Sequence, residues 1–227
     1  MNDLSVKLEN VNARIACACK ASGRNPGEIR LLAVSKGQPE AAIRSVHALG
    51  QRAFGENYLQ EALGKQHSFG ELDIEWHFIG AIQSNKAHEI ARCFAWVHSV
   101  DRERVLERLS AGRPAGITPL NVCLQVNIDA EESKSGIAPE ELPALARFAA
   151  AMPGIRLRGL MAIPQPSSEG GNPAASFAAM RQLFEGLRAE GLAVDTLSMG
   201  MSADLEQAIE AGSTMVRIGT DLFGPRG

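Results

Sequence analysis

The chain has 227 residues, 45% of them hydrophobic, and carries a formal net charge of -3 with a pI near 6.0. That length is typical of one α/β barrel, which forms a single unit of about 250 residues. An acidic chain offers neither the basic surface that binds nucleic acids nor a polybasic membrane patch, so we expect neither partner.

Segment 1–14 is charged and amphipathic and lacks the apolar core of a secretion signal. The chain has no run of about 18 apolar residues, so no membrane-spanning helix is predicted. The four cysteines have no C-x-x-C spacing; they are Cys17, Cys19, Cys93 and Cys123. We interpret them as reduced core thiols and expect a soluble, cytoplasmic protein.

Apolar residues at helical spacing predict a helix over residues 2–23, ended by Gly23 and Pro26. Strands and helices then alternate along the chain. The predicted strands cover residues 30–36, 53–57, 74–80, 96–100, 120–128, 155–163, 196–200 and 215–219. The predicted helices between them cover residues 40–49, 58–67, 85–94, 102–111, 139–152, 173–190 and 203–211.

Strict alternation requires parallel strands joined by right-handed crossovers, and eight such units close more readily as a barrel than as an open sheet. No G-x-G-x-x-G follows the first strand, which argues against a dinucleotide-binding open sheet. We therefore predict an α/β fold with a single (β/α)8 TIM barrel over residues 1–227. The extra amino-terminal helix takes the place of a missing outer helix.

The first predicted strand is a continuous apolar run that ends at Lys36. Such a run is typical of a strand buried on both faces. A lysine after a strand is usually a solvated strand end. If it is buried instead, desolvation lowers the pKa of the amine, and a neutral amine attacks aldehydes. Lys36 is therefore the first candidate for a functional group at the carboxyl mouth of the barrel.

The last two strands predict an anion site. The turn 198–202 leads from a strand into a helix, so the backbone N–H groups near Ser202 favour an anion. Gly219 and Thr220 follow the last strand and add close backbone access and a hydroxyl. Read singly, each is an ordinary turn residue. Together they predict a phosphate cradle, because barrels often bind phosphate after strands seven and eight.

Strand alternation places Arg217 on the same side as Gly219, facing into the barrel. A guanidinium there requires an acceptor. Two interpretations remain open. Arg217 either forms an ion pair with a carboxylate such as Glu56, or it donates to a ring nitrogen or a substrate oxygen.

An amine, a phosphate cradle and a guanidinium suit the aldehyde, the phosphate and the pyridine nitrogen of pyridoxal 5'-phosphate (PLP). A Schiff-base aldolase also uses a barrel lysine, but it needs a carboxylate or tyrosine relay, which the strand ends scarcely offer. A barrel that binds another phosphorylated metabolite, with Lys36 as a point charge, stays open.

Five segments resemble the YggS/PROSC family of pyridoxal phosphate homeostasis proteins. They are AVSK at 33–36, FGENY at 54–58, HFIGAIQSNK at 77–86, SMGMSAD at 198–204 and VRIG at 216–219. The resemblance extends over nearly the whole chain. It departs at Gly37 and Gln38, where the family usually has Thr-Lys, so no second lysine is expected beside the site.

The resemblance implies a fold like the amino-terminal barrel of alanine racemase, which is a PLP fold-type III barrel, here without the second β domain. It also implies an internal aldimine on Lys36 and an Arg217 that faces the pyridine nitrogen. The other cofactor-binding residues that it implies are Ser202, Gly219 and Thr220 at the phosphate, and Asn57, Ser198 and Met199 along the cofactor.

The function implied by the resemblance is PLP homeostasis, meaning buffering of the cofactor and delivery to PLP-dependent apoenzymes, without evident turnover. We assign no catalytic residue and expect a monomer. The alternative is a racemase-like enzyme that uses Lys36 and Tyr58 as opposed bases. Tyr58 is the only tyrosine of the chain and opens a predicted helix, which favours a packing role.

Three further features are interpreted structurally. His77 and His98 lie on predicted strands and are expected to be buried barrel histidines. No carboxylates accompany them at metal-site spacing, so no metal is predicted. The polar loop 131–136 has the composition of a mobile lid over the cofactor.

Overall fold

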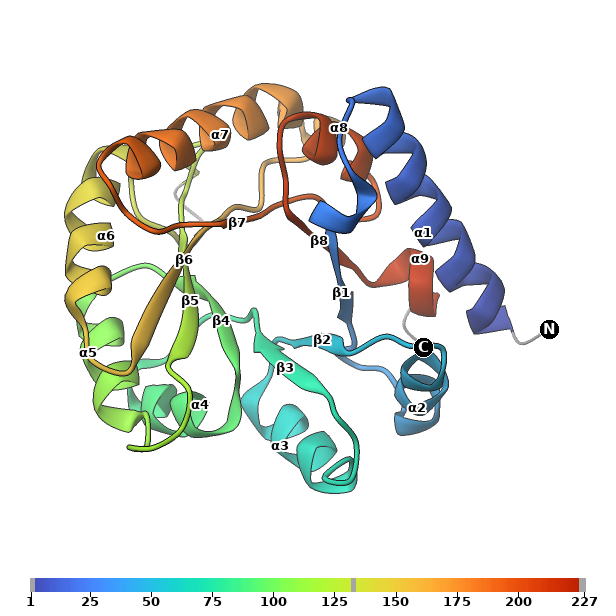
Figure 1. Cartoon of the computed structure of the whole chain (residues 1–227), viewed down its shortest axis with the longest axis horizontal. Coiled ribbons are helices and arrows are strands. Elements are labelled where there is room, and N and C mark those ends of the chain that lie inside the picture. The colour runs from blue at the N-terminus through green and yellow to red at the C-terminus, as the bar shows by residue number, and fades with distance from the viewer. Residues whose placement is uncertain (1–2, 132–133, 225–227) are drawn as a thin grey trace.

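In the computed structural model, which describes residues 3–131 and 134–224, eight parallel strands close into a barrel in sequence order (Figure 1). Strands β1 and β8 pair and close the ring. The strands are β1 (Arg30–Val34), β2 (Ala53–Glu56), β3 (Glu75–Phe78), β4 (Trp96–Val100), β5 (Leu120–Gln125), β6 (Ile155–Met161), β7 (Thr196–Ser198) and β8 (Met215–Ile218). The predicted TIM barrel is confirmed.

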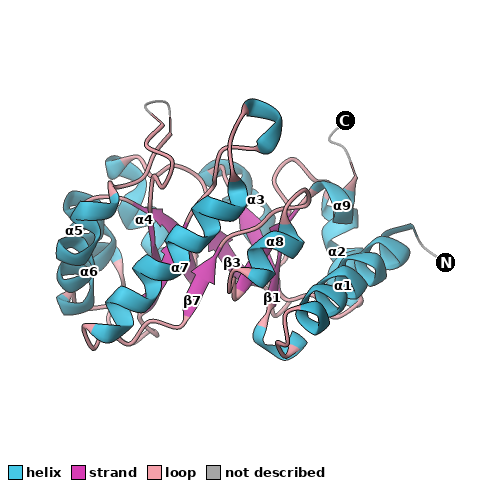
Figure 2. Ribbon diagram, turned by 90° about the horizontal axis from the view of Figure 1, so that it is seen from above, coloured by secondary structure: helices cyan, strands magenta, loops and turns pink. Residues whose placement is uncertain are grey.

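Helices surround the barrel, and the strands lie inside them (Figure 2). The main helices are α1 (Asp3–Ala21), α2 (Glu40–Ala48), α3 (Leu59–Ser68), α4 (Ala87–Cys93), α5 (Glu103–Gly112), α6 (Leu142–Ala151), α7 (Pro173–Ala189), α8 (Leu205–Glu210) and α9 (Thr220–Phe223). The short helix α9 was not predicted. Coverage on both faces explains why the strands are nearly continuous apolar runs.

Seven of the eight strands end one to three residues earlier than predicted, and only β4 ends at the predicted residue. The largest difference is at β5, which ends at Gln125. At β3 and β5 the hydrogen bonds to the neighbouring strand continue for one more residue, because the N–H of Ile79 donates to Glu56 O and the N–H of Val126 donates to Met161 O, both at 2.9 Å. Beyond Val126, the N–H of Asn127 donates to the carbonyl of Ile137 at 2.9 Å instead of to a barrel strand.

Helix α1 packs against α8, α9 and α2 and covers the closure between β8 and β1, as predicted (Figure 1). Its buried residues repeat at helical spacing; they are Leu8, Val11, Ile15, Ala18 and Cys19. Cys17 lies on the opposite, exposed face, so its interpretation as a core thiol is wrong. The four cysteines are free thiols. Among the described residues, no helix combines the length and apolarity needed to span a bilayer.

His77 and His98 lie in the barrel interior, as predicted, and neither is exposed. The ring of Trp96 stacks on His77 with centroids 5.3 Å apart, and the guanidinium of Arg158 lies 4.5 Å from the Trp96 centroid. Burial lowers the pKa of His77 from 6.5 to about 4, and burial likewise lowers the pKa of His98 well below 6.5. Both imidazoles are therefore neutral at pH 7.

A buried ionic cluster ties α3 to the ends of β1 and β2. Lys65, only 6% exposed, donates from Nζ to Glu56 Oε1 at 2.7 Å, to Ser35 O at 2.7 Å and to Glu61 Oε1 at 2.6 Å. Ser35 Oγ also donates to Glu56 Oε1 at 2.6 Å. Burial raises the pKa of Glu56, while the hydrogen bonds from Lys65 and Ser35 act to lower it.

The buried histidines predict a pH dependence of stability. Their pKa is lower in the folded than in the unfolded protein, so the unfolded chain binds more protons below about pH 6.5. The free energy of unfolding should therefore decrease as the pH falls from about 6.5 to about 4. His77 alone should contribute about 3 kcal/mol.

Urea unfolding between pH 4 and pH 7 measures this effect. His77→Gln should flatten the profile, whereas His88→Gln, at an exposed position, should leave it unchanged. A wild-type profile with the same slope as His77→Gln contradicts the assignment.

The ionic cluster predicts that Lys65→Met destabilises the protein by about 3 to 5 kcal/mol, because the Glu56 carboxylate is then buried without its cation. Adding Glu56→Gln should recover part of the loss. Arg147→Met, which breaks an exposed pair with Glu190, should cost less than about 1 kcal/mol. Urea unfolding measures the free energy of unfolding of each variant. If Lys65→Met and Arg147→Met lower it equally, Lys65 and Glu56 do not form a buried ion pair.

Candidate functional site

A cavity of about 320 Å³ opens at the carboxyl mouth of the barrel, within the size range of small-molecule sites. It brings together residues that follow β1, β2, β7 and β8. Six of the eight residues predicted to bind a cofactor line it; they are Lys36, Asn57, Ser202, Arg217, Gly219 and Thr220. Their contacts with a cofactor stay predictions.

Lys36 lies two residues beyond β1, half-buried, in a turn where Gly37 has a φ of 70°. Both neighbours of Lys36 are held by the ionic cluster of α3. The carbonyl of Ser35 accepts from Lys65, and the N–H of Gly37 donates to Glu61 Oε1 at 2.6 Å. The backbone that carries the Lys36 side chain is thus fixed on both sides.

The loop after β7 presents backbone N–H groups to the cavity. Gly200 has a φ of 95°, and a Cβ there would lie 2.5 Å from the Ala208 Cβ, so glycine lets the loop pack closely on α8. Asp204 Oδ1 then accepts from the N–H of Met201 at 2.6 Å and holds the turn.

Within the described part of the chain, the N–H groups of Ser202, Ala203 and Gly219 have no protein acceptor. All three residues line the cavity. Converging free N–H groups form a nest for an anion such as phosphate. The predicted phosphate cradle therefore has unused donors.

Arg14 of α1 contacts the loop of this anion site from the outer side of the barrel. It donates from Nη2 to the carbonyl of Ser202 at 2.9 Å and from Nε to Glu206 Oε1 at 2.7 Å, and it bonds the carboxylate of Asp221 through Nη1. A cation between two carboxylates offsets negative charge that would otherwise repel an anion in the nest. The hydrogen bond to Ser202 also connects α1 to the loop itself.

Arg217 is 4% exposed and borders the cavity from the barrel interior. Its Nη1 donates to Ser198 O at 2.7 Å and to Ser198 Oγ at 2.9 Å, and its Nη2 donates to Ala162 O at 2.8 Å. Burial lowers the pKa of Arg217 to about 10, which still leaves it charged at pH 7.

The alternative in which Arg217 pairs with Glu56 is wrong. Glu56 points away from the barrel axis, toward Lys65 on α3. Among the described residues, the acceptors of Arg217 take three of its five N–H groups. The other two have no acceptor among the described residues, and Arg217 borders the cavity.

The structure places Ser198 and Met199 elsewhere than the other predicted residues. Strand β7 ends at Ser198, whose buried hydroxyl contacts Arg217 and His98. Met199 is fully buried in the core, and its N–H donates to Met215 O at 3.1 Å. Neither residue lines the cavity. The Ser198 hydroxyl is occupied by Arg217 and His98, and the Met199 side chain packs in the hydrophobic core.

Asn57, in the loop after β2, also borders the cavity. A Cβ on Gly80 would lie 2.0 Å from Asn57 O, so the glycine permits a close approach of the two backbones. Among the described groups, Asn57 Oδ1 is buried and lacks a hydrogen-bond partner. A buried acceptor without a donor is costly and indicates a missing ligand group or water.

The predicted lid 131–136 includes residues 132 and 133, which lie outside the described residues. Lys134 and Ser135 line a hollow of about 290 Å³ that shares Asn57 with the cavity. The lid stays a prediction. Within 3–131 and 134–224, no group of three or more His, Cys, Asp or Glu side chains is arranged to hold a metal.

Sequence reasoning missed Arg14, Lys65 and Glu61. The spacing of Glu61 and Lys65 at i and i+4 was a usable signal for a helical ion pair. Nothing in the local sequence around Arg14 indicated its contact with Ser202, 188 positions away.

The alanine racemase N-terminal domain family matches residues 6–227. The chain is 58% identical to the pyridoxal phosphate homeostasis protein of Pseudomonas aeruginosa over 226 residues, covering 100% of this chain and 97% of that protein. It is 51% identical to the protein of the same name from Escherichia coli, with 100% and 98% covered.

PipY of Synechococcus elongatus, solved with PLP bound, is similar in structure. It has a TM-score of 0.79 and 37% identity, and the match covers 94% of this chain and 100% of PipY. The chain therefore belongs to the alanine racemase N-terminal domain family and, within it, to the pyridoxal phosphate homeostasis proteins.

Proposed function

We propose that this protein binds PLP as an internal aldimine on Lys36 and takes part in PLP homeostasis by buffering or delivering the cofactor, without catalytic turnover. The observation that carries the proposal is the convergence of Lys36, Arg217 and the free N–H groups of the phosphate loops on one cavity. The bound PLP of PipY supports the choice of cofactor.

The residues fit each polar part of PLP. The N–H groups of Ser202, Ala203 and Gly219 suit the phosphate, and the two remaining N–H groups of Arg217 suit the pyridine nitrogen as an acceptor. The buried Oδ1 of Asn57 lacks a protein donor and suits a water molecule or another donor held in the cavity. The amine of Lys36 suits the aldehyde.

The same arrangement favours storage over catalysis. When bound, PLP serves enzymes as an electron sink, and that property is strongest when its ring nitrogen is protonated. A charged Arg217 at this nitrogen disfavours the protonated ring, because two positive charges repel at short range.

A racemase-like reaction also needs a second base on the cofactor. Tyr58, the only tyrosine of the chain, is 61% exposed and lines a neighbouring groove rather than the cavity. Recipient apoenzymes and a monomeric state stay predictions.

Lys36→Ala should abolish the absorbance band of the protonated imine, expected at roughly 420 nm after PLP is added. Lys86→Ala should retain the band, because Lys86 lines the neighbouring groove and not the cavity. A wild-type protein that shows no band with excess PLP would remove the basis of the proposal.

Borohydride reduction followed by peptide mass measurement separates PLP from other phosphorylated metabolites. Only an imine is trapped, so the phosphopyridoxyl group should be found on the peptide that contains Lys36. If phosphorylated compounds bind without any trapped adduct, Lys36 acts only as a point charge.

The racemase alternative predicts exchange of solvent deuterium into the Cα position of an amino acid, and loss of that exchange in Tyr58→Phe. We expect exchange no faster than with free PLP, and no effect of Tyr58→Phe, because the phenol is exposed outside the cavity. Proton NMR of alanine in deuterium oxide measures it. Rapid exchange that depends on Tyr58 would establish an enzyme.

A further inference from the structure

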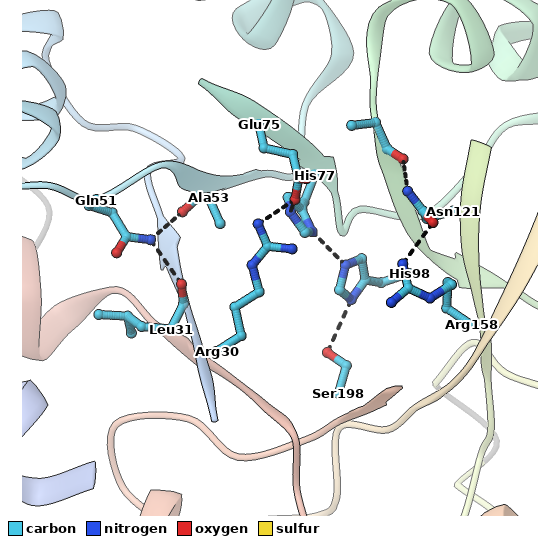
Figure 3. A network of polar contacts seen from close by, with 11 residues as sticks. Arg30, Leu31, Gln51, Ala53, Glu75, His77, His98, Asn121, Arg158 and Ser198 are labelled. Carbon is cyan, nitrogen blue, oxygen red and sulfur yellow. Dashed lines mark hydrogen bonds and ion pairs between the residues drawn. The ribbon is translucent and has the colours of Figure 1, made fainter. Parts of the chain in front are cut away.

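A chain of hydrogen bonds connects the amino end of the barrel to Arg217, and Figure 3 shows it from Glu75 to Ser198. Glu75 Oε1 lies 2.6 Å from His77 Nε2, and His77 Nδ1 lies 2.9 Å from His98 Nε2. His98 Nδ1 lies 3.0 Å from Ser198 Oγ, which accepts from Arg217 Nη1 at 2.9 Å. The two histidines and Ser198 are fully buried.

The carboxylate end of this chain fixes the direction of the hydrogen bonds as far as Ser198, and the guanidinium end is compatible with that direction. A guanidinium only donates, and an ionised carboxylate only accepts. Burial acts to raise the pKa of Glu75, but the hydrogen bond from His77 and the charge of Arg30 outweigh it and lower that pKa. Arg30 Nη2 lies 2.7 Å from Glu75 Oε1 (Figure 3). Glu75 is therefore an acceptor at pH 7.

The tautomers follow step by step. His77 donates from Nε2 to Glu75, so its Nδ1 carries no proton and accepts from His98 Nε2. His98 Nδ1 then accepts from the hydroxyl of Ser198. That hydroxyl is left with its lone pairs toward Arg217, which donates to it. Each donor meets an acceptor, and no bond in the series conflicts with another.

We propose that Glu75 is a positioning residue for Arg217, acting across the barrel through His77, His98 and Ser198. With the Ser198 hydroxyl oriented as an acceptor, Nη1 of Arg217 is held on Ser198 and Nη2 on Ala162. The plane of the guanidinium is then set, and its two remaining N–H groups have a fixed direction. The value of this orientation to the cofactor rests on the proposed function.

A purely structural role of Glu75 is the competing interpretation, since Glu75 also pairs with Arg30 near Trp96. Asp195 provides a matched control. It is a carboxylate that pairs with Arg158, whose guanidinium also lies over Trp96, but it takes no part in the chain to Arg217.

The test is nitrogen NMR on cofactor-free protein labelled with ¹⁵N in histidine and arginine. The wild type should show both His77 and His98 as Nε2–H tautomers. Glu75→Gln should populate the second tautomer of each, because an amide donates as well as accepts, and should shift the Arg217 Nε–H signal. Asp195→Asn should change neither. Unfolding midpoints establish that the variants are folded.

Transmission through Ser198 is tested by a double-mutant cycle. Ser198→Ala should itself shift the Arg217 signal, and adding Glu75→Gln in that background should shift it no further. In PLP titrations, Glu75→Gln should weaken binding roughly three- to tenfold, the effect of one impaired hydrogen bond, and Asp195→Asn should not. If Glu75→Gln fails to fold, the proposal is still tested by the wild-type tautomers and by the Arg217 signal of Ser198→Ala.

An Nδ1–H tautomer of His98 in the wild type overturns the proposal. An Arg217 signal that shifts equally in Glu75→Gln and Asp195→Asn also overturns it. The same holds if Ser198→Ala does not shift the Arg217 signal, or if Glu75→Gln still shifts it in the Ser198→Ala background. A wild-type protein that binds no PLP overturns the proposed function instead, because the tautomers and the Arg217 signal are measured without cofactor.

Discussion

The buried guanidinium of Arg217 is the constraint on which the site depends. A charge in a closed barrel must be solvated by protein groups, and here these groups are the carbonyls of Ser198 and Ala162 and the Ser198 hydroxyl. No described carboxylate forms a salt bridge with it, so its charge is not neutralised by a direct partner. The guanidinium therefore remains available to an acceptor in the cavity, and the positive charge shapes what can bind there.

The other parts of the site are held by contacts that approach it from outside the barrel. The ionic cluster around Lys65 fixes the backbone on both sides of Lys36, and Arg14 fixes the loop that carries Ser202. The residues that make these two sets of contacts lie on helices α3 and α1, respectively. The mouth thus combines a rigid barrel with loops whose positions are set by buried or half-buried ion pairs, which suits a site that binds a cofactor in one orientation.

The barrel was predictable because each strand is an apolar run covered on both faces, and because strict alternation with helices leaves few topologies. The convergence of Lys36, Arg217 and Gly219 followed from their places at strand ends. The directions of the side chains at the end of β7 were harder to predict. The Ser198 hydroxyl faces the barrel interior, where it contacts Arg217 and His98. Strand alternation therefore directs the next side chain, Met199, into the hydrophobic core on the opposite face. Partners distant in sequence, such as Arg14 and Ser202, leave no local pattern to read.

The protonation state of the bound ring nitrogen tests the central claim most directly. PLP labelled with ¹⁵N at the pyridine nitrogen can be bound to the protein and its chemical shift measured near pH 7. The account predicts the shift of an unprotonated pyridine that accepts a hydrogen bond, and a change in that shift in Arg217→Gln. A pyridinium shift in the wild-type protein would contradict the placement of Arg217 at the ring nitrogen and, with it, the interpretation of the cavity as a storage site.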